Sequence, residues 1–372
     1  MNQYEVSVVM PCLNESATVG ICVEKALRTM QSLKIKGEVI VADNGSSDNS
    51  VMIAEQAGAK VVHQPAKGYG NAYISGFQAA QGKYIIMGDS DDSYDWTDLE
   101  RFIQPLRQGY DMVMGNRLGG TITKGAMPFL HRYFGVPVLT AMLNILFSGK
   151  IGDAHCGMRS FTREAYDRMR LNTTGMEFAS EMIIKAKQAG LKIAEIPITL
   201  HPDGRPGKPH LKSFSDGWRH VRFMLNYKPG VLYLLPGWIM LALGAGGLLG
   251  YIINSLAKYP DNPMTMIWGT AFVAAAVAGY FLLILGAVAL AKNYTGHFPK
   301  TEKSTEKFFR KFKSGQGIWQ GIVLTLVGII LVSDAAMGVA GFAFLGIMLA
   351  ALGIITVFAS FLLGQMNVFG KE

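Results

Sequence analysis

Two carboxylates, Asp89 and Asp91, are the side chains of this sequence with the most evident chemical use. They follow the apolar run 84–88, whose β-branched residues predict a buried strand. In extended backbone, residues two positions apart project from the same side, so the two carboxylates would lie together. Paired oxygen ligands of this kind suit Mg²⁺ or Mn²⁺, and such an ion suits a nucleotide diphosphate. The alternative is a solvated acidic turn before a helix, and residues 97–100 (Thr-Asp-Leu-Glu) predict a capping box there.

The elements that must position these carboxylates are predicted by an alternation of apolar runs and helical spacing. Strands are expected at residues 6–10, 38–43, 60–63, 84–89, 112–114 and 193–200. The segments between the first five carry helix-type spacing, as at Val19, Val23 and Ala26. This alternation predicts an α/β domain with a mostly parallel sheet. Because ligands bind beyond the carboxyl ends of strands in such sheets, the residues that follow each strand are the candidate site.

Polar residues and glycines end or follow five of these strands, in segments 11–15, 43–48, 67–71, 89–91 and 115–117. Each segment also has a structural alternative: Asn14 and Asp48 would suit helix starts, and Gly45 would suit a turn. The Lys-Gly-Tyr-Gly run at 67–70 resembles a phosphate-cradling loop. Taken in order, the five segments favour a functional site.

These segments resemble the GT-A glycosyltransferases of family 2, over about residues 5–225. Within that family the likeness is to polyprenyl-phosphate sugar transferases, such as dolichyl-phosphate mannose or glucose synthases and GtrB-like bacterial proteins. It rests on six motifs: VVMPCLNE at 8–15, VADNGSSD at 41–48, KGYGNA at 67–72, GDSD at 88–91, GNR at 115–117 and CGMRSF at 156–161. The resemblance implies a GT-A catalytic domain with a Rossmann-like sheet.

The resemblance also implies roles for individual residues. The nucleotide would be bound by Pro11, Asn14, Glu15, Asp43, Lys67, Gly68 and Asp89. Asp89 and Asp91 would hold Mg²⁺ or Mn²⁺ on the diphosphate. Many relatives add a Gln ligand where this chain has Ser93, so the third ligand is left to Asp92 or water. The lipid phosphate would be held by Arg117, Arg132, Arg205 and Lys208, and Arg117 and Arg205 would join the two aspartates as catalytic residues.

The chemistry implied by the resemblance needs no general base. A phosphate monoester is already largely ionised at neutral pH, because its second pKa is about 6. Positioning and charge neutralisation would then carry the catalysis. The metal would stabilise the departing nucleoside diphosphate, and arginines would clamp the acceptor phosphate. Attack from behind the anomeric carbon would give inversion, as the family's grouping implies.

The chain of 372 residues is half hydrophobic, and its second part is the more apolar. A boundary near 228–230 predicts a cytoplasmic transferase domain at 1–228 and a membrane domain at 229–372. Apolar stretches at 231–253, 266–290, 318–333 and 339–363 predict four transmembrane helices. By the positive-inside rule, the basic loop 292–316 would be cytoplasmic, on the side of the transferase domain. No cleavable signal is visible before residue 6, so a multi-pass protein of the plasma (inner) membrane is expected.

The formal net charge of +8 indicates anionic lipid and no nucleic acid as partner, because the basic residues gather beside the apolar segments. Residues 127–134 and 136–147 suit a helix in the membrane interface, with an ordinary buried helix as the alternative. The aromatic and basic segment 214–227 would meet the bilayer surface. Glycines at 244–250 would allow close helix packing within the chain or in a homo-oligomer.

The predicted function is inverting transfer of a hexose from a UDP- or GDP-linked sugar to undecaprenyl or dolichyl phosphate at the cytoplasmic membrane face. One alternative is a processive polysaccharide synthase, but its Gln-x-x-Arg-Trp motif does not occur in the sequence. Another is a noncatalytic scaffold or lipid-linked-sugar transporter, against which the intact Asp89 and Asp91 argue. Glu177 and Glu181, four residues apart on a predicted helix, are expected to contact sugar hydroxyls or to serve the fold, and His155 is expected to be structural.

Overall fold

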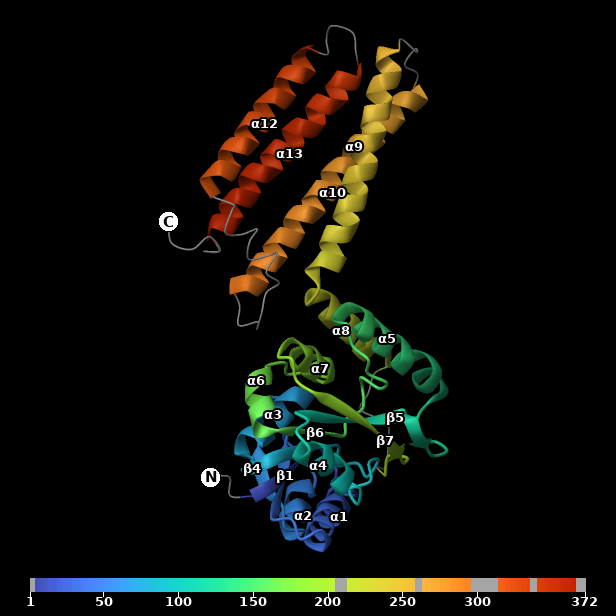
Figure 1. The fold of residues 1–372 in the computed structure, drawn as a ribbon, viewed down its shortest axis with the longest axis vertical. Helices are drawn as coiled ribbons and strands as arrows, with labels where there is room; N and C mark the ends of the chain where they lie inside the picture. The colour runs from blue at the N-terminus through green and yellow to red at the C-terminus, as the bar shows by residue number, and fades with distance from the viewer. Residues whose placement is uncertain (1–3, 205–212, 258–262, 296–313, 335–339, 366–372) are drawn as a thin grey trace. The chain divides into compact units, whose positions relative to one another are not determined.

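The computed structural model describes residues 4–204, 213–257, 263–295, 314–334 and 340–365 (Figure 1). The chain divides into two compact units, Met1–Met224 and Leu225–Glu372. The first is built on a sheet and the second on long apolar helices. The predicted class, an α/β domain with a mostly parallel sheet followed by membrane-type helices, is confirmed.

One seven-stranded sheet forms the centre of the first unit, in the order β3-β2-β1-β4-β6-β5-β7. Its strands are β1 (Tyr4–Cys12), β2 (Gly37–Asp43), β3 (Lys60–His63), β4 (Gly82–Met87), β5 (Met112–Ile122), β6 (Arg159–Thr162) and β7 (Ile193–Leu200). The pairs β1–β2, β1–β4, β2–β3 and β5–β7 are parallel, whereas β6 runs antiparallel to both β4 and β5. The carboxyl ends of β1, β2, β3 and β4 therefore meet at one edge.

Strand β6 was not predicted, and β5 is longer than predicted. In β6 both Arg159 and Ser160 are fully buried, so the strand lacks the apolar run by which buried strands are identified. Its polar groups are satisfied by tertiary contacts: Ser160 Oγ, for example, donates to the Phe102 carbonyl at 2.8 Å. Strand β5 continues past the predicted end at residue 114 because its pairing with β7 resumes at Thr121, after an irregularity.

Helices cover both faces of this sheet (Figure 1). The helices up to residue 226 are α1 (Val19–Ser32), α2 (Ser50–Gln56), α3 (Tyr69–Ala79), α4 (Leu99–Arg107), α5 (Val136–Phe147), α6 (Arg163–Met169), α7 (Phe178–Gln188) and α8 (Ser213–Asn226). Apolar faces of α1, α2 and α4 pack with Val6, Val8 and Met10 of β1 in one core. On the opposite face, α3 lies so close to β1 that a Cβ at Gly76 would come within 2.4 Å of Val9.

The predicted capping box at the start of α4 is wrong. Helix α4 begins at Leu99, and its N-cap residue Asp98 makes no side-chain capping hydrogen bond. Thr97 instead donates from both its backbone N–H and its hydroxyl to Asp95 Oδ1, at 2.9 and 2.6 Å. The aspartate two residues earlier offers a local turn partner that competes with the helix end.

The segment 129–147 exposes large apolar side chains. The π-helical turn η1 (His131–Gly135) leads into α5, of which only Thr140 and Leu143 are buried. Phe129, Phe134 and Ile145 expose 74%, 67% and 81% of their surface. This much exposed apolar surface argues against the alternative of an ordinary buried helix.

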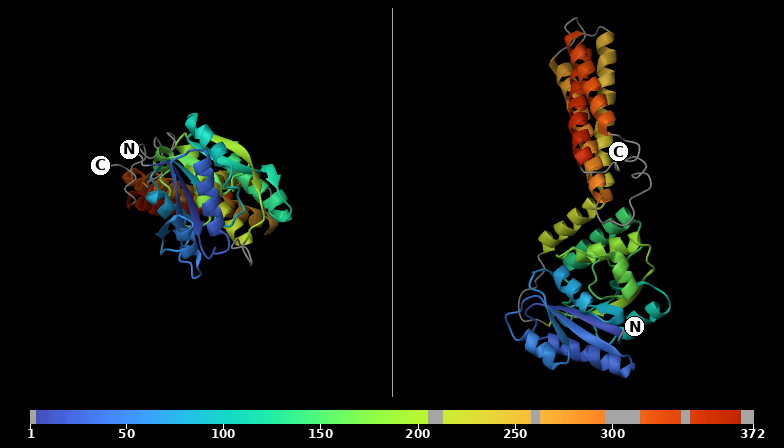
Figure 2. Two further views of the ribbon diagram at one scale, coloured as in Figure 1. Left: turned by 90° about the horizontal axis from the view of Figure 1, so that it is seen from below. Right: turned by 90° about the vertical axis from the view of Figure 1, so that its left-hand side faces the viewer.

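The second unit holds four helices long and apolar enough to cross a membrane, counted among the described residues. After the turn η2 (Gly230–Leu234) they are α9 (Leu235–Leu256), α10 (Pro263–Thr295), α12 (Ser314–Asp334) and α13 (Ala340–Gln365), which run alongside one another (Figure 2). A Cβ at Gly328 would lie 2.5 Å from the Gly346 carbonyl, so α12 and α13 touch backbone to backbone. Of the four glycines at 244–250, Gly244 and Gly247 pack against α10, whereas a Cβ at Gly246 or Gly250 would meet nothing within 4 Å.

Candidate active site

Loops from four parallel strands are joined at the sheet edge by short hydrogen bonds. The Asn44 N–H donates to the Cys12 carbonyl at 2.9 Å, and the Gln64 N–H donates to the Asp43 carbonyl at 2.8 Å. The Ser90 hydroxyl donates to the Pro11 carbonyl at 2.7 Å. The segments that were singled out after β1, β2, β3 and β4 therefore meet in one place.

Asn14 and Glu15 are tied to the loop that follows β2. Asn14 adopts a left-handed conformation, with φ of 58°, and its side-chain oxygen accepts from the Ser47 N–H at 2.8 Å. The Glu15 N–H donates to the Ser50 hydroxyl at 2.7 Å, and the Glu15 side chain is buried at 6% exposure. Neither residue begins a helix, because α1 starts at Val19. The turn at Asn14 thus places Glu15 beside the loop of β2.

Asp43 is a buried carboxylate held in its ionised form. Its oxygens accept from the Ser46 N–H at 3.0 Å and from the Gly45 N–H at 3.2 Å. Burial alone would raise the pKa of this carboxyl, but the hydrogen bonds from Ser46 and Gly45 hold its pKa below the usual value. A fixed anionic acceptor of this kind suits the N–H and O–H groups of a base or a ribose.

Lys67 and Gly68 are bound to the same loop through Asn44. The Asn44 side-chain oxygen accepts from the Gly68 N–H at 2.8 Å, and its amide group donates to the Gln64 and Ala66 carbonyls. Lys67 Nζ donates to the carbonyls of Asn44 and Gly45 at 2.8 and 3.1 Å. Asn44, which sequence reasoning did not single out, is therefore the link between the β2 loop and the start of α3.

The glycines at 68 and 70 serve backbone packing, which weakens the phosphate-cradle interpretation. The N–H groups of Gly70 and Asn71 both point to the Thr174 carbonyl, at 3.0 and 3.4 Å. A Cβ at Gly68 would lie 2.3 Å from that same carbonyl oxygen. Together with the N–H of Gly68, three amides at the start of α3 already have protein acceptors. Here a protein loop occupies the position that a phosphate takes at other helix N-termini.

Asp89 and Asp91 follow β4, each held by neighbouring hydroxyls. Asp89 Oδ1 accepts from the hydroxyls of Tyr69 at 3.0 Å and Tyr73 at 3.3 Å. Burial is the main reason that the pKa of both tyrosines is raised, so both remain protonated donors at neutral pH. Asp91 Oδ1 accepts from Ser93, at 3.1 Å from the N–H and 2.6 Å from the hydroxyl.

Two carboxylates in this arrangement fit Mg²⁺ or Mn²⁺. Both are hard oxygen ligands, and these ions commonly take one or two carboxylates and fill the remaining positions with water and substrate phosphate. Among the described residues, no group of three or more His, Cys, Asp or Glu side chains forms a complete cage. The Ser93 hydroxyl donates to Asp91. Asp92 forms an ion pair with Lys25, and its two carboxylate oxygens lie 2.7 and 3.0 Å from Lys25 Nζ. Of the two proposed third ligands, the geometry favours water over Asp92.

Arg117 is paired with Asp153, a residue of the segment 153–157 that was expected to position the acceptor or the sugar. Its Nε and Nη2 lie 2.6 and 2.9 Å from the two oxygens of Asp153, whose side chain is fully buried. Burial would raise the pKa of Asp153, but the hydrogen bonds and charge of Arg117 hold it below its usual value. The pair fixes the guanidinium in one orientation. Tyr94 lies within electrostatic reach of both Arg117 and Asp89, which relates this pair to the β4 carboxylates.

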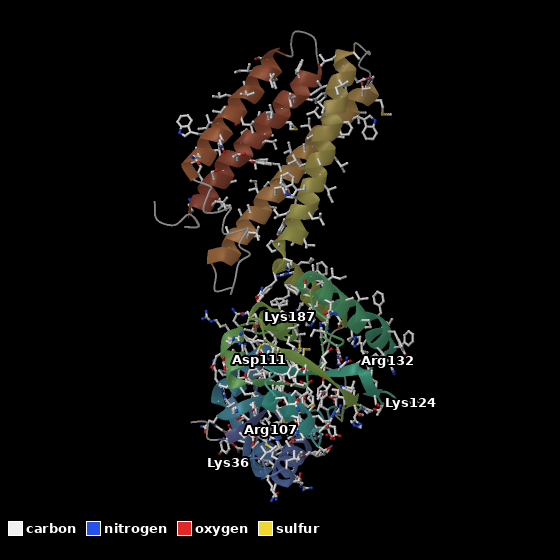
Figure 3. All side chains as sticks on the ribbon, viewed as in Figure 1. Lys36, Arg107, Asp111, Lys124, Arg132 and Lys187 are labelled. Atoms are coloured by element: carbon white, nitrogen blue, oxygen red, sulfur yellow. The ribbon has the colours of Figure 1, made fainter. Side chains whose placement is uncertain are left out.

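Of the other predicted phosphate ligands, the structure describes Arg132. Arg132 lies on η1, with its guanidinium 5.4 Å from the centre of the Tyr133 ring. Figure 3 shows Arg132 at the right-hand edge of the α/β unit, above Lys124. Arg205 and Lys208 fall outside the described residues.

The Cys-Gly-Met-Arg segment, which leads into β6, lies beside the second oxygen of Asp89. The Gly157 N–H donates to the Tyr94 hydroxyl oxygen at 2.8 Å, and a Cβ on Gly157 would come 2.9 Å from Asp89 Oδ2. Arg159 is fully buried and donates to the carbonyls of Cys156, Ala154 and Ala179. The motif itself was visible in the sequence, but its contacts with Asp89 and Tyr94 depend on the fold.

Glu181 and His155 both make contacts that stabilise the fold. A role in the fold was one of the two expectations for Glu181 and the expectation for His155. Glu181 is fully buried, forms a 2.7 Å ion pair with Lys185, and accepts from the Asn172 and Thr173 N–H groups. The His155 ring packs edge-on against His220, 4.6 Å between centres, and burial lowers its pKa well below the usual value. Both histidine rings thus belong to the packing between the 153–157 segment and α8.

Known proteins of one family resemble this chain. Residues 7–170 match the family described as Glycosyl transferase family 2. The low-salt glycan biosynthesis hexosyltransferase Agl6 of Haloferax volcanii is 38% identical over 372 residues, 97% of this chain and 89% of that protein. The dolichyl-phosphate hexose transferase of the same organism is 32% identical over 216 residues, 57% of this chain and 89% of that protein.

Among solved structures, glucosyl-3-phosphoglycerate synthase from Mycobacterium tuberculosis, crystallised with Mn²⁺, UDP and glucosyl-3-phosphoglycerate, is 22% identical with a TM-score of 0.47. The match covers 60% of this chain and 79% of that one. The family match spans the strands whose loops form the site, and the likeness to Agl6 extends along nearly the whole chain. The predicted resemblance is confirmed, and the chain belongs to glycosyl transferase family 2.

Proposed function

We propose that this protein is an inverting, divalent-metal-dependent hexosyltransferase that moves a hexose from a UDP- or GDP-sugar to a polyprenyl phosphate. The observation that carries the proposal is the pair Asp89 and Asp91 after β4. The residue between them, Ser90, donates to the Pro11 carbonyl of the β1 loop, and each carboxylate accepts from a neighbouring hydroxyl. A polyprenyl acceptor is supported by the four membrane-type helices of the same chain. The names of the relatives, a hexosyltransferase and a dolichyl-phosphate hexose transferase, point to the same reaction class.

The nucleotide would lie across the loops after β1 and β2. Asp43, ionised and fixed by its turn, would accept from the base or ribose, with Pro11, Asn14 and Glu15 alongside. Lys67, whose ammonium group rests on the carbonyls of that same turn, would add positive charge on the diphosphate side.

The chain's own residues then position the reacting groups. Asp89 and Asp91 would hold Mg²⁺ or Mn²⁺, which when bound stabilises negative charge on a leaving nucleoside diphosphate. Arg117, held in one orientation by Asp153, would hold the acceptor phosphate. Arg132, Arg205 and Lys208 would supply further positive charge for that phosphate. Because the acceptor phosphate is already anionic, none of these residues has to remove a proton.

We further propose that residues 1–228 act on the cytoplasmic side of the plasma membrane and that residues 229–372 anchor them. The support is the lysine- and arginine-rich segment 292–316, which the positive-inside rule assigns to the cytoplasm. The exposed apolar side chains around η1, with Arg132 and His131 among them, would lie in the lipid interface.

The test is transfer of radiolabelled sugar into solvent-extractable lipid by the purified full-length protein, with polyprenyl phosphate, Mn²⁺ or Mg²⁺, and a panel of UDP- and GDP-hexoses. Labelled lipid with one donor is expected, and Asp91→Asn should lower the rate by about 100-fold or more through loss of a metal ligand. Glu24→Gln, at an exposed surface pair with Arg28, is the matched control and should retain the rate. Label in a polymer would favour a processive synthase, and no transfer with any donor would favour a noncatalytic protein.

A further inference from the structure

One oxygen of Asp89 accepts two hydrogen bonds, from phenolic hydroxyls on successive turns of the same helix. Tyr69 and Tyr73 are four residues apart on α3, and their hydroxyl oxygens lie 3.0 and 3.3 Å from Asp89 Oδ1. We propose that these two tyrosines are positioning residues that set the Asp89 carboxylate for the divalent cation. The inference rests on the proposed function, in which Asp89 is a metal ligand.

The two hydroxyls occupy one side of the carboxylate. A carboxylate oxygen offers about two acceptor positions, so both on Oδ1 are used by the tyrosines. A cation held by Asp89 would meet the other oxygen, Oδ2, which lies on the side of Gly157. A single-oxygen contact of fixed direction is what a small octahedral ion such as Mg²⁺ requires, because it demands near-ideal geometry.

The rings that carry these hydroxyls are themselves fixed by packing. The Tyr73 side chain has 0% exposure and stacks on Phe178 at 5.9 Å and on Phe77 at 5.5 Å between ring centres. The Tyr69 ring meets Tyr73 edge-on at 4.9 Å. Neither hydroxyl can leave Asp89 without moving this aromatic cluster, so the direction of the carboxylate is built into the core.

The start of α3 is fixed in turn by a buried ion pair on α7. The Gly70 and Asn71 N–H groups donate to the Thr174 carbonyl. The loop that carries Thr174 is held by Glu181, which accepts from the Thr173 N–H at 2.9 Å and pairs with Lys185 at 2.7 Å. A continuous series of contacts thus runs from the Glu181–Lys185 pair to Asp89.

A Tyr→Phe change removes the hydroxyl and keeps the ring, so it tests the positioning of Asp89 without disturbing the aromatic packing. In Tyr69→Phe or Tyr73→Phe the aromatic cluster remains, but the Asp89 carboxylate loses one of the hydrogen bonds that orient it and stabilise its charge. Groups that orient a metal ligand typically change metal affinity by about 10- to 100-fold. We expect each single variant to bind Mn²⁺ about tenfold more weakly, and the double variant more weakly still. Tyr166→Phe is the matched control, because Tyr166 packs on Phe77 in the same cluster.

The experiment is titration of Mn²⁺ into full-length purified protein, followed by electron paramagnetic resonance, with UDP in one arm and GDP in another. Thermal unfolding of each variant is measured in parallel. Weaker Mn²⁺ binding by Tyr69→Phe or Tyr73→Phe, with wild-type binding by Tyr166→Phe and little change in Tm, is the expected result. If the tyrosine variants bind Mn²⁺ as the wild type does while Asp89→Asn does not, the positioning role is overturned and the proposed function stands. If the wild type binds no Mn²⁺ with either nucleotide, both fail.

Discussion

Arg117 reaches the candidate site already paired with Asp153, through two hydrogen bonds of 2.6 and 2.9 Å. The Arg117 side chain is 12% exposed and that of Asp153 is fully buried. Much of the guanidinium charge is therefore balanced before any substrate binds. The contribution of Arg117 to a phosphate acceptor would lie in its fixed direction more than in its net charge.

Asp153→Asn is expected to lower both stability and use of the acceptor. Removing one partner of a buried ion pair typically costs about 3–5 kcal/mol, because the other charge is left without compensation. With Arg117 free to turn, kcat/KM for polyprenyl phosphate should fall at least about tenfold, while nucleotide binding should be unchanged. Asp98→Asn is the control, since its pair with Arg101 is more exposed and should be worth less than about 1 kcal/mol. An unchanged kcat/KM in a folded Asp153→Asn protein would exclude the positioning role.

The same pair predicts how stability depends on pH. The folded-state pKa of Asp153 lies below its unfolded value, so the folded protein binds fewer protons between the two. The stabilisation is complete above the unfolded pKa, about 3.9, and is lost as pH falls through the folded pKa. The difference in free energy of unfolding between wild type and Asp153→Asn should therefore narrow as the pH is lowered below about 4. No such narrowing is expected for Asp98→Asn, because burial raises the pKa of that carboxyl.

Ser93 is predicted to act through Asp91. Its hydroxyl donates to Asp91 Oδ1 at 2.6 Å, so Ser93→Ala removes this hydrogen bond and keeps the one from the Ser93 N–H. The apparent KM for Mn²⁺ should rise about tenfold, with a smaller change in kcat at saturating metal. Ser32→Ala, which removes a hydroxyl bonded only to a carbonyl of its own helix, serves for comparison. Equal metal dependence of the two variants would mean that Ser93 has no part in holding the ion.

Glu181 and Lys185 should show strong coupling when replaced. Glu181→Gln leaves a buried ammonium group without its partner and is expected to destabilise the protein by about 3–5 kcal/mol. Replacing both residues with Met should cost less than the sum of the single changes, because no unpaired charge remains. Thermal unfolding of the three variants measures this, with the exposed Glu24 and Arg28 pair as the comparison. Additive losses would show that the two side chains act independently.

The apolar residues around η1 should lie in lipid when the whole protein is in a bilayer. A nitroxide at position 134, where Phe134 is 67% exposed, is expected to collide mainly with oxygen, which concentrates in lipid. A nitroxide at position 52 on α2, where Met52 is 49% exposed, should collide mainly with a water-soluble nickel reagent. Both are measured on full-length protein in vesicles. Water-like behaviour at position 134 would refute the interfacial placement.

Six of the seven strands were predicted near their observed positions, because each of the six carries local apolar residues. Strand β6 was not predicted, because the partners that bury Arg159 and Ser160 lie far along the chain. The capping box at Thr97 failed because Asp95 competes for the same donors.

The residues of the candidate site could be predicted from the sequence, but many of the contacts between them could not. Asp89, Asp91 and Asp43 follow strands and are visible as carboxylates at strand ends. The contacts that orient Asp89 and Arg117 join residues 16, 20 and 36 positions apart: Tyr73 with Asp89, Tyr69 with Asp89, and Asp153 with Arg117. No local pattern marks such pairs, because only the packed sheet brings them together.

Arg159 gives the site an uncompensated positive centre. Its three nitrogens donate to backbone carbonyls, and no ion pair with it is found in the part of the chain that the structure describes. Its field reaches the Tyr69 and Tyr94 hydroxyls and Asp153. The carboxylates of Asp89 and Asp91 and an incoming phosphate would repel one another, and a buried cation without a carboxylate of its own would offset that repulsion. A lysine, with one point charge on a flexible stem, could not span the three carbonyls, so the planar fork of arginine is what allows the interior to hold this charge.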